Sequence, residues 1–246
     1  MTTRIAHDDG VSAPPLRYGF VLFDVGDTLI GPRASFGAVY ARVLGSLGIH
    51  RSAEEIEKAL RAHWGRINAA LTPGVDRYGL YPGGEEEYWR RFVEGTLGDP
   101  ALAARAVTPL RDAFRDPAAW LVFDDTVPTL RALSEMNVKL GVVSNWDSRL
   151  RPLLDSLGLT RWFDTIVVSC EEGIEKPDPR LFLRAVERLG GTPERTLHVG
   201  DVPELDEAGA TAAGIASVLV DRIGKLPSSH RALSDLSTLP TIVGSR

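Results

Sequence analysis

The chain has 246 residues, of which 43% are hydrophobic and 25% are charged, and its formal net charge is −5. This length fits one large domain, or a domain with a smaller one inserted, and the charge balance lacks the strongly basic surface of a nucleic-acid-binding protein. The single cysteine excludes an internal disulfide, and the sequence has neither a signal-peptide core nor an apolar run of membrane-spanning length. We therefore expect a cytoplasmic protein without a nucleic-acid or membrane partner.

The structured part of the chain is predicted to begin near Arg17. Residues 1–16 are polar and contain prolines, so we expect a flexible leader there. The segment Tyr18–Ile30, YGFVLFDVGDTLI, is an apolar run that leads into a turn of Gly and Asp. Such a run is typical of a buried parallel strand, and open α/β sheets bind ligands beyond the carboxyl ends of their strands. Asp24 is therefore placed for chemistry.

Helical patterns dominate residues 32–125, where no strand-like alternation stands out. Ser52 and Glu55 form a capping box, and Ile56, Leu60 and Trp64 follow at helical spacing. Other helices are predicted over Ser35–Leu47, Glu85–Leu97 and Asp99–Phe114. This helical segment interrupts the α/β pattern.

Helices and buried strands alternate from Thr126 to Val220. The predicted strands are Val138–Val143, Thr165–Ser169, Thr196–Val199 and Ala216–Val220. The predicted helices are Val127–Met136, Ser148–Leu157, Pro179–Leu189 and Glu207–Ala213. This alternation indicates right-handed crossovers in a doubly wound parallel sheet, so the fold class is α/β. The tail adds a short strand and a turn near Leu233–Val243.

Polar residues follow the predicted strands. They are Asp24, then Ser144 with Asn145, then Lys176, then Asp201 with Asp206. Parallel strands end at one edge of their sheet, so we expect these side chains to meet in one crevice. Carboxylates suit Mg²⁺, while hydroxyl and ammonium groups suit the oxygens of an anionic substrate.

The same residues form an ordered set of motifs. They are Asp24-Val25-Gly26-Asp27-Thr28, Ser144 in GVVSN, Lys176 in EKPDPRLF, and Gly200-Asp201 followed by Asp206. In this order and at strand ends, the set resembles the haloacid dehalogenase (HAD) superfamily, and the helical segment resembles its type-1 cap. The resemblance covers about residues 17–222. It implies a Rossmann-like core over residues 17–31 and 126–246 and a smaller helical cap domain over residues 32–125.

The resemblance also implies roles for the residues around the nucleophile. Asp24 would attack phosphorus and form an aspartyl-phosphate that water hydrolyses. Mg²⁺ would be held by the Asp24 carboxylate, the Gly26 carbonyl oxygen and Asp201. Asp206 would be a further metal ligand, or would orient Lys176 or a metal-bound water, and its alternative role is a helix N-cap.

Three further residues would bind the transferring phosphoryl group. They are Ser144, Lys176 and, as an alternative to a structural role, Asn145. The alternative interpretation of Lys176 is a solvated surface lysine.

Position 26 departs from the family pattern. Related phosphatases carry an acid/base carboxylate two residues after the nucleophile, and Gly26 cannot supply one. Asp27 takes this catalytic role only if the turn swings it toward the site; otherwise it bonds the loop backbone.

We therefore expect a Mg²⁺-dependent phosphohydrolase of a small phosphorylated metabolite, with activity weakened by Gly26. The alternatives are a HAD-fold protein that binds a phosphorylated ligand with little turnover, and a 2-haloacid dehalogenase, which needs neither the metal nor the acid. Neither the substrate nor the oligomeric state follows from the sequence.

Overall fold

The computed structural model describes residues 16–70, 74–227 and 230–244. The predicted leader lies outside the described residues except for Leu16, whose carbonyl oxygen accepts a hydrogen bond from Arg195 at 2.8 Å. No helix among the described residues is long and apolar enough to cross a membrane.

The larger part of the molecule is built on a parallel sheet. Its strands, in the described residues, follow the order β5-β4-β1-β6-β7-β8. They are β1 (Phe20–Phe23), β4 (Lys139–Ser144), β5 (Thr165–Val168), β6 (Thr196–Gly200), β7 (Ala216–Val220) and β8 (Ala232–Leu233). All neighbouring pairs are parallel. This architecture confirms the predicted α/β class.

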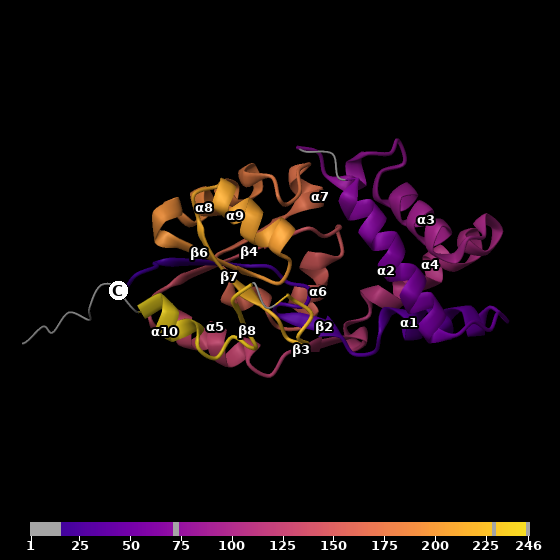
Figure 1. Ribbon diagram of the computed structural model, residues 1–246, viewed down its shortest axis with the longest axis horizontal. Coiled ribbons are helices and arrows are strands. Elements are labelled where there is room, and N and C mark those ends of the chain that lie inside the picture. Colours follow the sequence, from indigo (N-terminus) through magenta and orange to yellow (C-terminus); the bar gives the residue numbers. More distant parts are fainter. Residues whose placement is uncertain (1–15, 71–73, 228–229, 245–246) are drawn as a thin grey trace, which may run out of the picture.

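Helices cover both faces of the sheet (Figure 1). One face carries α8 (Pro179–Leu189) and α9 (Ala208–Ala212), and the other carries α5 (Thr126–Glu135) and α10 (Leu239–Gly244). Alternate residues of β1 point to opposite faces, so Leu22 packs in the cluster with α8 while Phe23 packs in the cluster with α5 and α10. Because β1 is buried on both faces, its sequence is a continuous apolar run.

Two short helices lie in the connections that follow β4 and β5. They are α6 (Leu150–Ser156) and α7 (Ser169–Glu172). Strand β5 ends one residue before the end of the predicted strand, because α7 begins at Ser169. The C-terminal strand prediction near Leu233 is correct, but α10 replaces the predicted turn and packs against α5.

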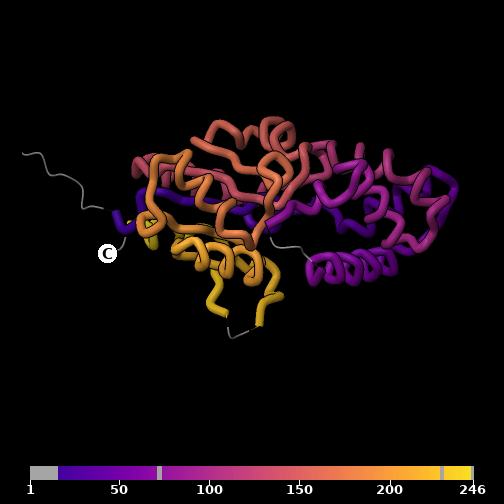
Figure 2. Tube along the Cα trace, turned by 90° about the horizontal axis from the view of Figure 1, so that it is seen from above, coloured from indigo at the N-terminus to yellow at the C-terminus, as the bar shows by residue number. Residues whose placement is uncertain are grey.

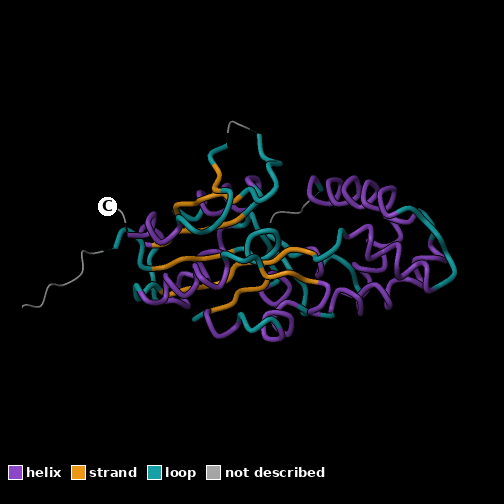
Figure 3. Tube along the Cα trace, turned by 90° about the horizontal axis from the view of Figure 1, so that it is seen from below, coloured by secondary structure: helices purple, strands orange, loops and turns teal. Residues whose placement is uncertain are grey.

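The second part of the molecule is helical, as Figure 3 shows by colour. It contains α1 (Phe36–Ser46), α2 (Ala53–Ala69), α3 (Gly84–Leu97) and α4 (Pro100–Arg115). These helices share a hydrophobic cluster of their own, which includes Leu44, Leu60, Phe92 and Leu110. The helical part and the sheet part lie end to end in two perpendicular views (Figures 1 and 2).

A two-stranded antiparallel ribbon connects the two parts. It consists of β2 (Ile30–Pro32) and β3 (Trp120–Val122). Strand β3 lies inside the segment in which no strand was expected. Three residues are too few to show a period-two pattern, so this pairing depends on a contact that the local sequence does not reveal.

Candidate active site

The strand order places three polar strand ends side by side. Asp24 follows β1, Ser144 ends β4 and Asp201 follows β6, and β1 lies between the other two strands. The backbone N–H of Asp24 donates to the Val199 carbonyl oxygen at 2.8 Å, so the ladder with β6 continues to the nucleophile position. The sheet edge thus brings together residues that are far apart in the sequence.

Asp24 is buried and receives two hydrogen bonds on one carboxylate oxygen. Ser144 Oγ lies 2.9 Å from Asp24 Oδ1, and Lys176 Nζ lies 2.6 Å from the same atom. Among the described residues, none donates a hydrogen bond to Asp24 Oδ2. Burial raises the pKa of Asp24, an effect that the charge of Lys176 opposes. The free oxygen is therefore the atom available to a metal or to an electrophile.

Lys176 is a buried lysine, not a solvated one. Its ammonium lies 2.6 Å from both Asp24 Oδ1 and Asp206 Oδ1. Burial alone would lower the pKa of Lys176, but the charges of Asp206 and Asp24 raise it above its usual range. Lys176 therefore carries a positive charge at neutral pH.

Asn145 holds Lys176 through the main chain. The Asn145 Oδ1 atom accepts from the Lys176 N–H at 2.7 Å, and Asn145 Nδ2 donates to the Lys176 carbonyl oxygen at 3.0 Å. Both polar atoms of this side chain are thus engaged, which gives Asn145 a structural part in the site. Its predicted contact with substrate stays a prediction.

Asp206 is fully engaged by hydrogen bonds. Its Oδ1 atom contacts Lys176 Nζ and His198 Nε2, the latter at 2.9 Å, and its Oδ2 atom accepts from the N–H groups of Asp201 and Val202. Burial would raise the pKa of Asp206, but Lys176 and His198 lower it below its usual range. Asp206 lies inside a π-helical turn, Pro203–Glu207, so it is not an N-cap. Its contacts suit the orientation of Lys176.

Three carboxylates form a cluster that could hold a metal ion. One oxygen from each of Asp24, Asp201 and Asp206 lies within 4.8 Å of the other two. Burial and the charge of Asp24 raise the pKa of Asp201 to about 7, although Lys225 opposes this shift. Crowded buried carboxylates need a cation to neutralise them, and hard divalent cations prefer such oxygens.

The Gly26 carbonyl oxygen is available as a further ligand. Gly26 forms a parallel bridge with Ile30, made by the Ile30 N–H to the Val25 oxygen at 3.1 Å and the Asp27 N–H to the Ile30 oxygen at 2.8 Å. This bridge does not use the Gly26 oxygen. The carboxylates present therefore fit a divalent cation. The set of ligands predicted from the sequence, including the Gly26 oxygen, stays a prediction.

The turn after Asp24 does not bring Asp27 into contact with the nucleophile. Asp27 adopts a left-handed backbone conformation with φ of 52°, and its side chain is half exposed. Its carboxylate lies 3.7 Å from Lys225 Nζ, and no hydrogen bond joins it to Asp24. Lys225 had no signal in the sequence analysis, because it lies beyond the last motif.

Two hydrogen bonds join the helical part to the loops that carry Ser144 and Lys176. Trp89 Nε1 on α3 donates to Asp147 Oδ2 at 2.7 Å, three residues after Ser144. Arg77 Nε donates to Glu175 Oε2 at 2.5 Å, and Glu175 precedes Lys176. Both acidic partners are buried, so the helical part is positioned against the loops that carry the site.

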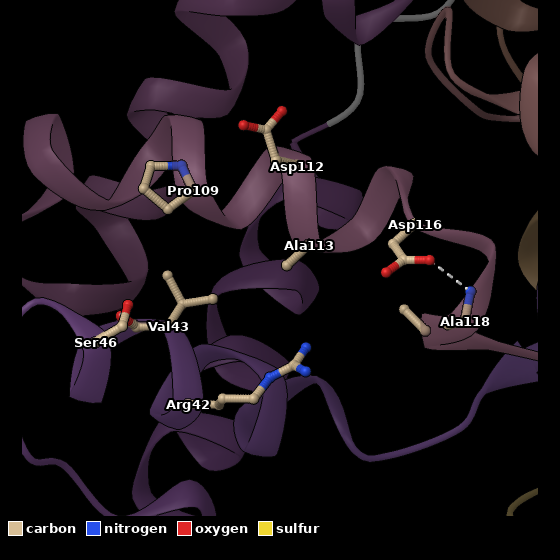
Figure 4. Close-up of a pocket in the computed structure, with 9 residues that line it drawn as sticks. Arg42, Val43, Ser46, Pro109, Asp112, Ala113, Asp116 and Ala118 are labelled. Carbon is tan, nitrogen blue, oxygen red and sulfur yellow. Dashed lines mark hydrogen bonds between the residues drawn. The ribbon is translucent and has the colours of Figure 1, made fainter.

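A cavity of about 420 Å³ lies elsewhere, between α1 and α4 (Figure 4). Arg42, Pro109 and Asp112 are among its lining residues, and Asp116 accepts a hydrogen bond from the Ala118 N–H at its edge. It contains no residue of the carboxylate cluster, so it is not part of the candidate site.

Comparison of this chain with known proteins shows the family to which it belongs. Residues 19–214 match the family model of haloacid dehalogenase-like hydrolases. The chain therefore belongs to this family of hydrolases, which confirms the family that the four motifs predicted.

Three similar proteins illustrate the range within this fold. Haloacid dehalogenase-like hydrolase domain-containing protein 3 of Danio rerio is 35% identical over 214 residues, which cover 85% of this chain and 86% of that protein. A glyceraldehyde 3-phosphate phosphatase of Methanopyrus kandleri is 33% identical over 217 residues, 82% of this chain and 83% of that protein. The structure of a 2-haloacid dehalogenase from Pseudomonas syringae pv. Tomato DC3000 matches with a TM-score of 0.62 at 23% identity, over 92% of this chain and 97% of that one. The fold alone therefore does not define the reaction.

Proposed function

We propose that this protein is a Mg²⁺-dependent phosphohydrolase that acts on a small phosphorylated metabolite through an aspartyl-phosphate. The observation that carries the proposal is the setting of Asp24: Ser144 and Lys176 donate hydrogen bonds to one of its carboxylate oxygens. The same carboxylate belongs to a cluster of three that fits a divalent cation. The similarity to a protein named as a glyceraldehyde 3-phosphate phosphatase also supports a phosphorylated substrate.

In the proposed first step, Asp24 is the nucleophile. One carboxylate oxygen of Asp24 forms a bond to phosphorus while the bond from phosphorus to the leaving oxygen breaks, and the electron pair departs with that oxygen. Ser144 and Lys176 donate hydrogen bonds to the phosphoryl oxygens, and Asp206 keeps Lys176 in place. A bound Mg²⁺ supplies neutralisation of the negative charge on phosphoryl and carboxylate oxygens.

The second step regenerates the nucleophile. Water attacks the phosphorus of the aspartyl-phosphate, the bond to Asp24 breaks, and the carboxylate is restored as inorganic phosphate leaves. Gly26 offers no group to protonate the leaving oxygen of the first step or to take a proton from this water. Turnover is therefore expected to favour aryl and acyl phosphates, whose leaving groups are stable as anions.

The helical part is proposed to be the cap of this site. Trp89 donates a hydrogen bond to Asp147, which lies three residues after Ser144. Arg77 donates one to Glu175, which precedes Lys176. A part placed there can exclude water from the reacting groups. We propose the boundaries at the β2–β3 ribbon, so the cap comprises α1 to α4.

A 2-haloacid dehalogenase is the second candidate, favoured by one observation. Gly26 lacks the acid that a phosphatase uses, and a dehalogenase, in which Asp24 displaces halide from carbon, needs no such acid. The buried carboxylates argue against this candidate, because a metal site has no part in that reaction.

A release assay tests the proposal. Purified protein is incubated with aryl, acyl and alkyl phosphates, with Mg²⁺ or with a chelator, and separately with short 2-haloacids. We expect phosphate release that requires Mg²⁺ and is lost in Asp24→Asn. Halide release without metal would support the dehalogenase instead. Ligand binding without release of either product would leave a binding protein.

A further inference from the structure

Lys225 brings a second ammonium group to the carboxylate cluster. Its Nζ lies 2.7 Å from Asp201 Oδ2 and 3.7 Å from Asp27 Oδ2. Lys176 is shared between Asp24 and Asp206, and among the described residues Lys225 is the one side chain that donates to the Asp201 carboxylate. Each of the three clustered acids therefore contacts an ammonium group.

The loop after β7 is built to place Lys225. The carboxylate of Asp221 accepts from the main-chain N–H groups of Lys225 at 2.9 Å and Leu226 at 2.8 Å, which closes a turn. Arg222 donates to the carbonyl oxygen of Thr28 at 2.6 Å, which ties this turn to the nucleophile loop. The loop follows β7, which ends at Val220. Its chain is part of the yellow segment that projects from the molecule in Figure 2. Anchors on both sides of Lys225 direct its side chain toward Asp201.

We propose that Lys225 is a resident counter-cation of the metal site, which competes with a divalent cation for Asp201 and transfers its ion pair to Asp27 when that cation binds. This inference rests on the metal site of the proposed function. Two cations on one carboxylate repel each other, and the repulsion is strong where burial lowers the effective dielectric constant. Asp27 is the half-exposed acid within reach that can receive the displaced ammonium.

Direct metal binding tests the inference without any turnover. Mn²⁺ is titrated into the protein, and the free ion is counted by electron paramagnetic resonance. We expect Lys225→Met to bind Mn²⁺ about tenfold more tightly than the wild type, because the competing charge is gone. The main-chain N–H, and not the side chain, bonds Asp221, so the turn is retained; Lys225→Gln serves as a second variant of similar size and no charge.

A matched control removes a lysine at the other end of the sheet. Lys139 begins β4, and its Nζ donates to the Leu189 carbonyl oxygen at 3.0 Å. Lys139→Met should leave Mn²⁺ affinity unchanged. Unchanged or weaker Mn²⁺ binding in folded Lys225→Met and Lys225→Gln would overturn the inference.

A double-mutant cycle tests the transfer to Asp27. Asp27→Asn should weaken Mn²⁺ binding in the wild type, because the displaced ammonium loses its partner, and should weaken it less in Lys225→Met. Equal effects in both backgrounds would contradict the transfer.

If no variant binds Mn²⁺, the metal site of the proposed function fails as well. If Mn²⁺ binds to all variants with the same affinity, only the role of Lys225 fails.

Discussion

Replacing Gly26 with aspartate restores a carboxylate two residues after the nucleophile and tests what its absence costs. The position can accept a side chain, because Gly26 does not have a positive φ and a Cβ atom there would meet Trp146 Cζ3 as its nearest neighbour, at 3.4 Å. That contact is close to ordinary van der Waals distance, so the ring needs at most a small shift.

The expected gain depends on the leaving group. General acid/base catalysis is typically worth about 10²–10⁴-fold. For an alkyl phosphate, whose oxygen needs a proton to leave, we expect Gly26→Asp to raise kcat by about 10²-fold, or about 2.7 kcal/mol of activation free energy. For an aryl phosphate, which leaves as a stable anion, the gain should be less than about tenfold.

The assay measures phosphate release from glycerol 2-phosphate and from p-nitrophenyl phosphate under saturating substrate and Mg²⁺. Gly26→Ala is the matched control, because it adds the Cβ atom without the carboxylate. An unchanged alkyl rate in a folded Gly26→Asp variant that binds metal would refute the reasoning, and so would an equal gain in Gly26→Ala. The unchanged rate would mean that Asp27 already serves or that another step limits turnover. The equal gain would mean that the added Cβ atom, and not the carboxylate, raises the rate.

Three further predictions concern buried charges. Arg77→Met leaves Glu175 buried without its partner, so we expect the free energy of unfolding to fall by about 3–5 kcal/mol. The double variant Arg77→Met with Glu175→Gln should recover part of this loss. Urea unfolding measures both effects, and an unchanged midpoint for Arg77→Met would contradict the prediction. Burial and the charge of Asp24 raise the pKa of Asp201 to about 7, so protons should compete with metal and Mn²⁺ affinity should fall as the pH drops through about 7. The raised pKa of Asp201 also affects stability. Between pH 3.8, the ordinary pKa of aspartate, and about pH 7, the metal-free native protein holds a proton on Asp201 that the unfolded chain has released. The free energy of unfolding should therefore decrease over this pH range in the wild type, relative to Asp201→Asn.

The parallel sheet could be predicted because each of its principal strands has a local signal. Strand β1 is buried on both faces and therefore appears as a short apolar run, and Asp24 after it marks the carboxyl end. The convergence of Asp24, Ser144 and Asp201 then follows from the geometry of parallel strands alone.

The residues that the sequence did not reveal make their contacts with residues that are far away in the sequence. Lys225 meets Asp201 across 24 residues, Trp89 meets Asp147 across 58 and Arg77 meets Glu175 across 98. A single lysine, tryptophan or arginine has many surface or packing roles, so its partner cannot be chosen without the fold. The ribbon of β2 and β3 was not predicted, because three-residue strands depend on pairing and not on a local pattern.

Detection of a phosphoryl group on Asp24 would show that this residue is the nucleophile. The protein is mixed with p-nitrophenyl phosphate and Mg²⁺, quenched in acid within the first turnover, digested and examined by mass spectrometry for a phosphoryl group on the peptide that contains residue 24. We expect this peptide to be phosphorylated in the wild type and unmodified in Asp24→Asn, which should also release no phosphate. Phosphate release by Asp24→Asn at the wild-type rate, with no labelled peptide in either protein, would contradict this role of Asp24.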